Sequence, residues 1–446
     1  MRLTWVQPED LLLHELVQSR HEGRSVEASE QRWLAVAGGS LTPPVSGAAD
    51  HPATPEQRLV AGQLLDELDD LPRPSDPRHP DTLGEVEAGW MTQAPEAPGA
   101  DLADRLRGAW AGRAAGCLLG KPVEKIPRAG IRAIADQTQN WPVRGYSTAV
   151  GLTPETAAAY PWNRRSAPTS LVETIAGMPE DDDLNYPLLN LALLERRGAE
   201  LRTEDVAIAW LADLPAARVF TAERAAYRNL LLAVPLDEVA VRRNPFREWI
   251  GALIRGDVFG WVHPGDPYAA ARLAWRDARL SHTRNGAYGE LWAAALASVS
   301  LVATDVDEVL HRAAAVVPAE SELAEAVRFG TELGRQPLEL DAHLDALHER
   351  YGHLHWVHVL NNAATIAWAL AVSRGDFTTA IGCAVMAGWD TDSVGATVGS
   401  VLGGLLGGDR LPPAWTLPLD NRIATSLPGG EVQIDALVAR TMALIQ

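Results

Sequence analysis

The sequence predicts an all-α fold, on three observations. From Asp101 onward the chain is rich in alanine and leucine at helical period. Alternating runs of β-branched residues, which would mark strands, are scarce. Of the 446 residues, 47% are hydrophobic and 22% charged, which is typical of a packed globular protein. We therefore expect helices packed around a sizeable core.

The first hundred residues predict an N-terminal helical extension that is not part of this core. Residues 1 to about 37 have amphipathic spacing and end in a segment rich in glycine and proline. A shorter amphipathic stretch, residues 59–68, precedes several prolines that cannot continue a helix. We expect residues 1–100 to form a helical extension with a Pro-rich linker, and residues 101–446 to form the main domain.

A long irregular connection is expected between Gly145 and Pro179, because prolines and small polar residues recur there. Such connections often line functional sites. This one leads directly into an acidic cluster, Glu180 and Asp181 to Asp183, which precedes leucines at helical spacing. Pro187 is tolerable if it lies in the first helical turn, so the carboxylates are expected at the helix N-terminus. Four adjacent carboxylates repel one another, which leaves metal binding and simple capping as open alternatives.

A second acidic motif, GWDTDSVG, places Asp390 and Asp392 two residues apart, with Ser393 next to them. In an extended turn these two carboxylates point the same way, and Ser393 adds a hydroxyl. An EF-hand loop is excluded because Val394 and Val401 occupy positions that need oxygen ligands. The two clusters together predict a dinuclear Mg²⁺ or Mn²⁺ site.

Glycines recur every four residues in the helix expected after the second motif. Each glycine costs about 1 kcal/mol in a helix interior relative to alanine, so the repeat indicates close approach of another backbone. We expect a buried central helix that fixes the second cluster.

The bulk properties exclude several classes of function. A formal charge of -19 disfavours general nucleic-acid or membrane-surface binding. Cys117 and Cys383 are the two cysteines, which excludes a disulfide framework and indicates a reducing, cytoplasmic location. The sequence has no signal-peptide layout and no apolar run of membrane-spanning length, so no membrane association is expected.

Three segments resemble the ADP-ribosylglycohydrolase family of the dinitrogenase-reductase-activating type: Gly108 to Ile126, MPEDDDLNYPLLNLALLE, and NNAATIAWAL with GWDTDSVGATVGSVLGG. The resemblance covers roughly residues 101–408. It implies an orthogonal multi-helix bundle and two divalent ions beside ADP-ribose. It also implies metal ligands at Glu180, Asp181, Asp182, Asp390, Asp392 and Ser393, although Glu180 and Asp183 stand where threonines are common.

The resemblance further implies roles for residues outside these clusters. Glu124 matches a glutamate near the ribose, and Asp181, Asp182 or Glu124 is expected to transfer the proton. His282 and Asn285, in SHTRNGAYGE, and Trp389 are candidate substrate-binding residues, with packing roles as the alternative. Asn361 and Asn362 either orient neighbouring groups or pack. The histidines at 353, 355 and 358 are interpreted as helix-start or surface residues rather than as a zinc site.

The predicted function is metal-dependent hydrolysis of an N- or O-glycosidic bond at the anomeric ribose carbon of an ADP-ribosylated protein or an ADP-ribose-like small molecule. Two alternatives stay open at this point. Paired metals also serve a phosphoesterase that acts on nucleotides, and the same pocket suits a non-catalytic ADP-ribose-binding protein. The sequence carries no signal for an oligomeric state.

Overall fold

The computed structural model describes residues 3–91, 94–163 and 166–445, and it confirms the all-α prediction. Helices of the N-terminal extension are α1 (Pro8–His21), α2 (Glu27–Ala37), α3 (Pro55–Asp69) and α4 (Leu83–Glu87). The next elements are α5 (Leu102–Gly120), η1 (Lys121–Val123), α6 (Arg128–Gln137), α7 (Pro154–Ala159), α8 (Ala167–Ser170), α9 (Asp182–Arg197), η2 (Gly198–Glu200), α10 (Thr203–Asp213), η3 (Ala216–Arg218), α11 (Thr221–Leu231), η4 (Ile250–Arg255), α12 (Asp257–Trp261) and α13 (Pro267–Ala278).

The C-terminal half continues as helices and adds one small antiparallel hairpin. Its elements are α14 (Arg284–Ser300), α15 (Val306–Ala313), η5 (Ala314–Val316), α16 (Glu322–Arg335), α17 (Leu340–Tyr351), α18 (Val359–Ser373), α19 (Phe377–Met386), α20 (Thr391–Leu406), η6 (Gly408–Arg410), α21 (Pro413–Thr416), η7 (Leu417–Leu419), β1 (Arg422–Ala424), β2 (Glu431–Gln433) and α22 (Ile434–Leu444). In the hairpin, Ile423 pairs with Val432.

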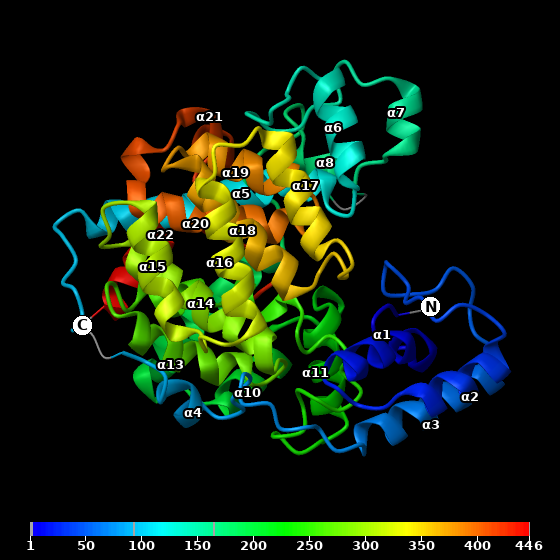
Figure 1. Cartoon of the computed structure of the whole chain (residues 1–446). Coiled ribbons are helices and arrows are strands. Elements are labelled where there is room, and N and C mark those ends of the chain that lie inside the picture. Colours follow the sequence, from blue (N-terminus) through cyan, green and yellow to red (C-terminus); the bar gives the residue numbers. More distant parts are fainter. Residues whose placement is uncertain (1–2, 92–93, 164–165, 446) are drawn as a thin grey trace.

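Helices α5 and α20 form the centre of the bundle, with α18 and α19 beside them (Figure 1). The backbones of α5 and α20 contact each other where glycines of the two helices face each other. A Cβ at Gly112 would lie 2.1 Å from the Gly399 carbonyl oxygen, and a Cβ at Gly399 would lie 2.1 Å from the Gly112 carbonyl oxygen. No side chain fits at either position, so the glycines are required by packing. This confirms that α20 is a buried central helix, and it fixes the start of α20 beside the end of α5.

The N-terminal extension does not lie apart from the core, so that expectation is wrong. Leu12 and Leu64 are fully buried and belong to the same hydrophobic cluster as the main helices. Buried ion pairs also connect the two parts, because the Arg247 guanidinium lies 2.8 Å from Glu15 and 2.6 Å from Glu22 of the extension. The stretch up to residue 37 that was expected to be helical consists of two helices, α1 and α2, separated around Gly23, whose φ is +76°.

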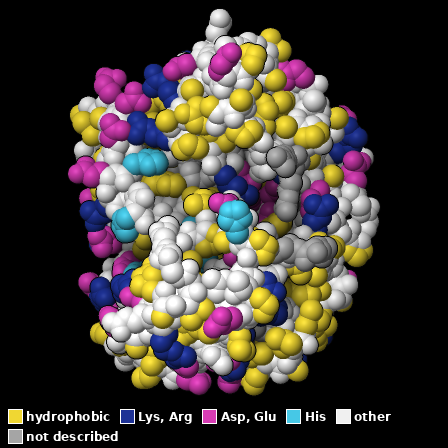
Figure 2. Space-filling model, turned by 90° about the vertical axis from the view of Figure 1, so that its right-hand side faces the viewer, with side chains coloured by type: hydrophobic (Ala, Val, Ile, Leu, Met, Phe, Trp, Pro, Cys, Tyr) yellow, Lys and Arg dark blue, Asp and Glu magenta, His cyan; other side chains and the backbone are white. Residues whose placement is uncertain are grey.

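Residues 145–179 are less irregular than expected, because α7 and α8 form there with prolines at their first turns. In Figure 1 this segment and α6 lie above the extension on the right-hand side of the molecule. The face between them is hollowed, and acidic and basic side chains are visible inside the hollow (Figure 2). Among the described residues, no helix is long and apolar enough to cross a membrane.

Candidate metal centre and active site

The first acidic cluster begins helix α9. Asp181 is the N-cap residue, and its side chain accepts a hydrogen bond of 2.9 Å from the Asp183 backbone N–H. Asp182 and Asp183 occupy the first helical turn, where the helix dipole favours negative charge. The predicted position of the carboxylates at the helix N-terminus is therefore confirmed.

Pro187 lies in the second turn of α9 instead of the first, and a buried arginine compensates for it. Proline has no N–H, so the carbonyl of Asp183, four residues earlier, loses its helical partner. The Arg113 Nε, from α5, donates to that carbonyl at 2.8 Å. Arg113 also donates to Asp257 at 2.7 Å and lies 3.4 Å from the Asp183 carboxylate. The proline thus makes α9 dependent on α5 at the acidic cluster.

The second cluster begins helix α20. Asp390 is the N-cap residue and Asp392 lies in the first turn, so the motif is not the extended turn that we expected. The Asp390 backbone N–H donates to Asn362 Oδ1 at 3.4 Å, and Asn362 in turn donates to the His358 carbonyl at 2.8 Å. Asn362 therefore orients the start of α20, as one of the two sequence interpretations proposed.

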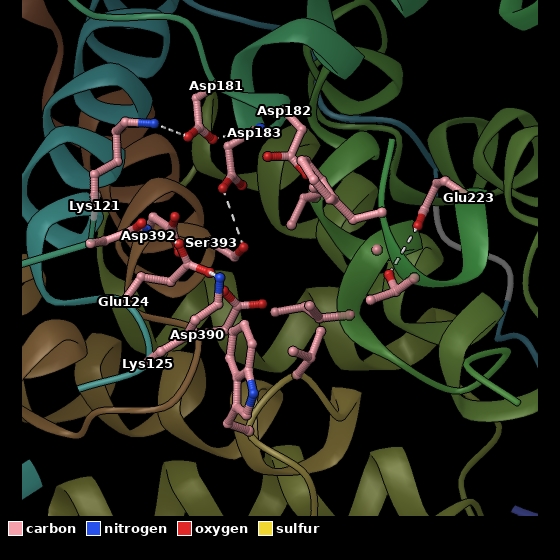
Figure 3. A pocket seen from close by; sticks show the side chains of 18 of the residues that line it. Lys121, Glu124, Lys125, Asp181, Asp182, Asp183, Glu223, Asp390, Asp392 and Ser393 are labelled. Atoms are coloured by element: carbon pink, nitrogen blue, oxygen red, sulfur yellow. Dashed lines mark hydrogen bonds and ion pairs between the residues drawn. The ribbon is translucent and has the colours of Figure 1, made fainter. Parts of the chain in front are cut away.

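The two helix starts face one cavity, which measures about 780 Å³ including the part open to solvent. Figure 3 shows the α9 carboxylates on one side and Asp390, Asp392 and Glu124 on the other. Glu124, Asp390 and Asp392 each offer a ligand oxygen within 4.8 Å of the others. Cys117, Asp181 and Asp183 form a second such group. The two clusters therefore line one cavity, as the resemblance implied, and Asp183 and Ser393, which are hydrogen-bonded, are 210 residues apart in sequence.

A buried lysine occupies the α9 side of the cavity. Lys121 Nζ forms an ion pair with Asp181 and also donates to the Glu180 carbonyl at 3.2 Å. Burial disfavours charge on both partners, but their mutual attraction outweighs it. The pKa of Asp181 is therefore lowered and the pKa of Lys121 raised.

The other aspartates of the cavity have raised pKa values. Burial is the largest cause for Asp182, and the charges of Asp181 and Asp392 add to it. Burial and Asp181 raise the pKa of Asp183 in spite of Arg113. Burial, Asp392 and Glu124 raise the pKa of Asp390, while burial, Glu124 and Asp181 raise the pKa of Asp392 to about 7. Such crowding of carboxylates is what a divalent cation relieves.

Ser393 links the two sides of the cavity, because its Oγ donates to Asp183 Oδ2 at 3.2 Å.

Glu124 lies at the rim of the cavity, where its carboxylate accepts a hydrogen bond from Asn163 and lies 2.9 Å from Lys125 Nζ. The Lys125 ammonium lies 5.3 Å from the centre of the Trp356 ring, which forms part of the wall. The rim therefore combines a carboxylate, an ammonium and an aromatic face.

Four of the predicted site residues do not face this cavity. The Glu180 side chain turns away, lies 3.0 Å from Arg218 and accepts from Asn185 at 2.9 Å. His282 and Asn285 are fully buried outside the cavity lining, and burial lowers the pKa of His282 well below its ordinary value. Trp389 stacks on His348 with ring centres 4.3 Å apart. None of these four residues lines the cavity, and none belongs to either ligand group of the cavity.

Sequence reasoning missed several residues that line or support the cavity. Lys121, Arg113 and Cys117 lie on or just after α5, and no local pattern marks them as partners of α9. Trp5 of the extension also lines the cavity and packs edge-on against Trp249, with ring centres 5.7 Å apart. The histidine interpretation is confirmed for His358, the N-cap of α18, while His355 is half-buried and stacks on Trp249.

The two acidic clusters, which begin α9 and α20 and line one cavity of an all-α domain, are a candidate site for divalent cations. The chain belongs to the ADP-ribosylglycohydrolase family, whose model matches residues 98–445. That membership supports a glycohydrolase-type function. A solved structure of an ADP-ribosylglycohydrolase-related protein complex aligns with a TM-score of 0.48 and 21% identity, over 78% of this chain and 99% of that chain. No curated protein matches the sequence.

Proposed function

We propose that this protein is a divalent-metal-dependent hydrolase of an N- or O-glycosidic bond at the anomeric ribose carbon of an ADP-ribosylated protein or an ADP-ribose-like small molecule. One observation carries the proposal. Two acidic clusters from helix starts converge in a single cavity, within a family of glycohydrolases.

The residues of the α20 side fit a hard divalent cation. Glu124, Asp390 and Asp392 present carboxylate oxygens, which Mg²⁺ and Mn²⁺ prefer. The raised pKa values of Asp390 and Asp392 reflect repulsion and burial that a cation offsets. Asp181, Asp182 and Ser393 are the proposed ligands on the α9 side. Bound divalent ions supply Lewis-acid chemistry that polarises oxygens and activates water.

Proton transfer is assigned to Asp182 or Glu124 in preference to Asp181. Asp181 is held as a carboxylate by Lys121, which makes it a poor proton donor. Asp182 lines the cavity, and no lysine or arginine among the described residues forms an ion pair with its carboxylate. Glu124 lies at the rim, where a leaving group can approach. Aromatic faces of Trp5, Phe220 and Trp356 in the wall suit stacking of a base or ribose.

The first experiment compares the wild type with an Asp390→Asn, Asp392→Asn variant after metal removal. We expect ADP-ribose to bind the wild type by calorimetry when Mg²⁺ or Mn²⁺ is added, and the variant to lose this binding. Turnover of ADP-ribosylated substrates should fall by at least 10³-fold, because the variant loses two anionic ligands. An Asp237→Asn, Asp420→Asn variant, which changes two exposed aspartates, is the matched control and should behave as wild type.

The products distinguish the alternatives. Release of free ADP-ribose or a free ribose product supports the glycohydrolase. Release of phosphate or nucleoside monophosphate would replace it with a phosphoesterase. Metal-dependent binding without any turnover would indicate a binding protein. Full activity of the Asp390→Asn, Asp392→Asn variant would overturn the metal mechanism.

A further inference from the structure

A second polar cluster lies away from the cavity, where the N-terminal extension meets the main helices. His21 ends α1, Glu322 begins α16, and Glu248 precedes η4. These three side chains each offer a ligand atom within 4.8 Å of the others. His21 Nε2 lies 3.1 Å from Glu322 Oε2. The cluster therefore brings an imidazole and two carboxylates together across the contact between the extension and the main helices.

His79, from the segment between α3 and α4, points at the same cluster. Its side chain is 1% exposed, and its Nε2 lies 3.8 Å from Glu322 Oε2. Neither ring nitrogen makes a hydrogen bond with any described residue. A buried polar group without a partner is costly, and a bound cation would satisfy it.

Neighbouring donors hold the carboxylates in place. Asn285 Nδ2 donates to Glu322 Oε2 at 2.9 Å and to Glu248 Oε2 at 2.8 Å. Gln18 Nε2 donates to Glu248 Oε1 at 2.7 Å, and Arg284 Nε lies 3.3 Å from the same oxygen. Glu248 therefore has the most polar neighbours of the group. Glu322 lies next to both imidazoles, those of His21 and His79. Donors of this kind commonly orient metal-binding carboxylates.

We propose that His21, Glu248 and Glu322 bind a Zn²⁺ ion, with His79 as the fourth ligand. Ligand atoms around a tetrahedral zinc lie roughly 3.3 Å apart. Glu322 lies 3.1 Å from His21 and 3.8 Å from His79, and the His79 ring must move closer to His21 and Glu248 to complete the site. Two imidazoles favour zinc over Mg²⁺, and two carboxylates balance its charge. The site is independent of the proposed function, because two of its ligands precede the segment that matches the family. Zinc here would fasten the extension, and with it Trp5, onto the main helices.

The test measures Zn²⁺ binding to the metal-stripped full chain in the Asp390→Asn, Asp392→Asn background, which removes competition from the cavity. We expect one Zn²⁺ per chain by calorimetry and elemental analysis, and a Co²⁺ absorption spectrum of a tetrahedral site. Adding His79→Gln should weaken binding by at least tenfold, and His21→Gln should do the same. His51→Gln, an exposed histidine of the same extension, is the matched control and should bind normally.

Zn²⁺ should also raise the melting temperature of the parent but not of the His79→Gln protein. If His79→Gln fails to fold, Glu322→Gln provides the same test, with circular dichroism to verify folding. Absence of stoichiometric Zn²⁺ binding at micromolar concentrations would overturn the proposal. So would equal binding by the parent and by both histidine variants, or an equal affinity for Mg²⁺.

Discussion

The two sides of the cavity carry similar carboxylates but differ in how the protein balances their charge. On the α9 side, Lys121 pairs with Asp181, and Arg113 lies 3.4 Å from Asp183. On the α20 side, no lysine or arginine among the described residues forms an ion pair with Asp390 or Asp392. Accordingly the pKa of Asp181 is lowered, whereas the pKa of Asp392 is raised to about 7.

Because of this difference, we expect the two sides to bind added cations with different affinities. The α9 side contains its own positive charge, so it can fold and hold Asp181 ionised without metal. The α20 side gathers carboxylates that repel one another, so a divalent ion gains the most there. The Glu124, Asp390 and Asp392 group is therefore the expected higher-affinity position, and the α9 side the weaker one.

Removing the Lys121 ammonium group should have the largest effect on the difference between the α9 and α20 sides. In Lys121→Met, Asp181 loses its partner in a buried position, and the metal-free protein should lose about 3 to 5 kcal/mol of unfolding free energy at neutral pH. Metal should recover more stability in this variant than in wild type, because the α9 side then binds a cation more tightly. Urea unfolding with and without Mn²⁺ measures both effects.

The matched control is Lys125→Met, which removes a lysine with a 43% exposed side chain from Glu124. Its loss should be about 1 kcal/mol or less. The deficit of Lys121→Met should also shrink at acidic pH, where Asp181 becomes protonated. Equal losses in the two variants would contradict the assigned asymmetry.

The two sides should also respond oppositely to pH in the metal-free protein. A carboxyl group whose pKa is higher when folded binds more protons in the folded state, so stability falls as pH rises between the two values. For Asp392 this window runs from 3.8 to about 7. Asp181 has a lowered pKa, so its contribution is present above 3.8 and is lost at more acidic pH.

Urea midpoints measured between pH 4 and about 7.5 test this response. The decline across the window should be smaller in Asp392→Asn, which cannot ionise, and saturating Mn²⁺ should offset it in wild type. If the urea midpoint of the metal-free wild type falls no more over this range than that of Asp392→Asn, burial at Asp392 is relieved in another way.

Much of this centre could be predicted from the sequence because its main features are local. The acidic residues that directly precede leucines at helical spacing predicted that Asp181 and Asp182 lie at a helix start. The glycines at intervals of four predicted that α20 is buried. Lys121 and Arg113 were missed because their partners lie 60 to 70 residues away and no short pattern encodes the contact. The extension was assigned outside the core because its amphipathic faces do not show what they cover, and Trp5 reaches the cavity only through tertiary packing.

The smallest expected effect comes from Ser393, whose hydroxyl connects the two sides. Ser393→Ala removes the 3.2 Å hydrogen bond to Asp183 and should cost about 1 kcal/mol, equivalent to a several-fold weaker metal affinity. Ser393→Thr keeps the hydroxyl and should stay close to wild type, so the pair separates loss of the oxygen from loss of volume. Because the hydroxyl belongs to α20 and its acceptor to α9, the alanine variant should weaken the second metal equivalent more than the first. Calorimetric titration with Mn²⁺ resolves the two equivalents. An equal loss of affinity in both would show that Ser393 acts by shaping the start of α20 and not through its hydrogen bond to Asp183.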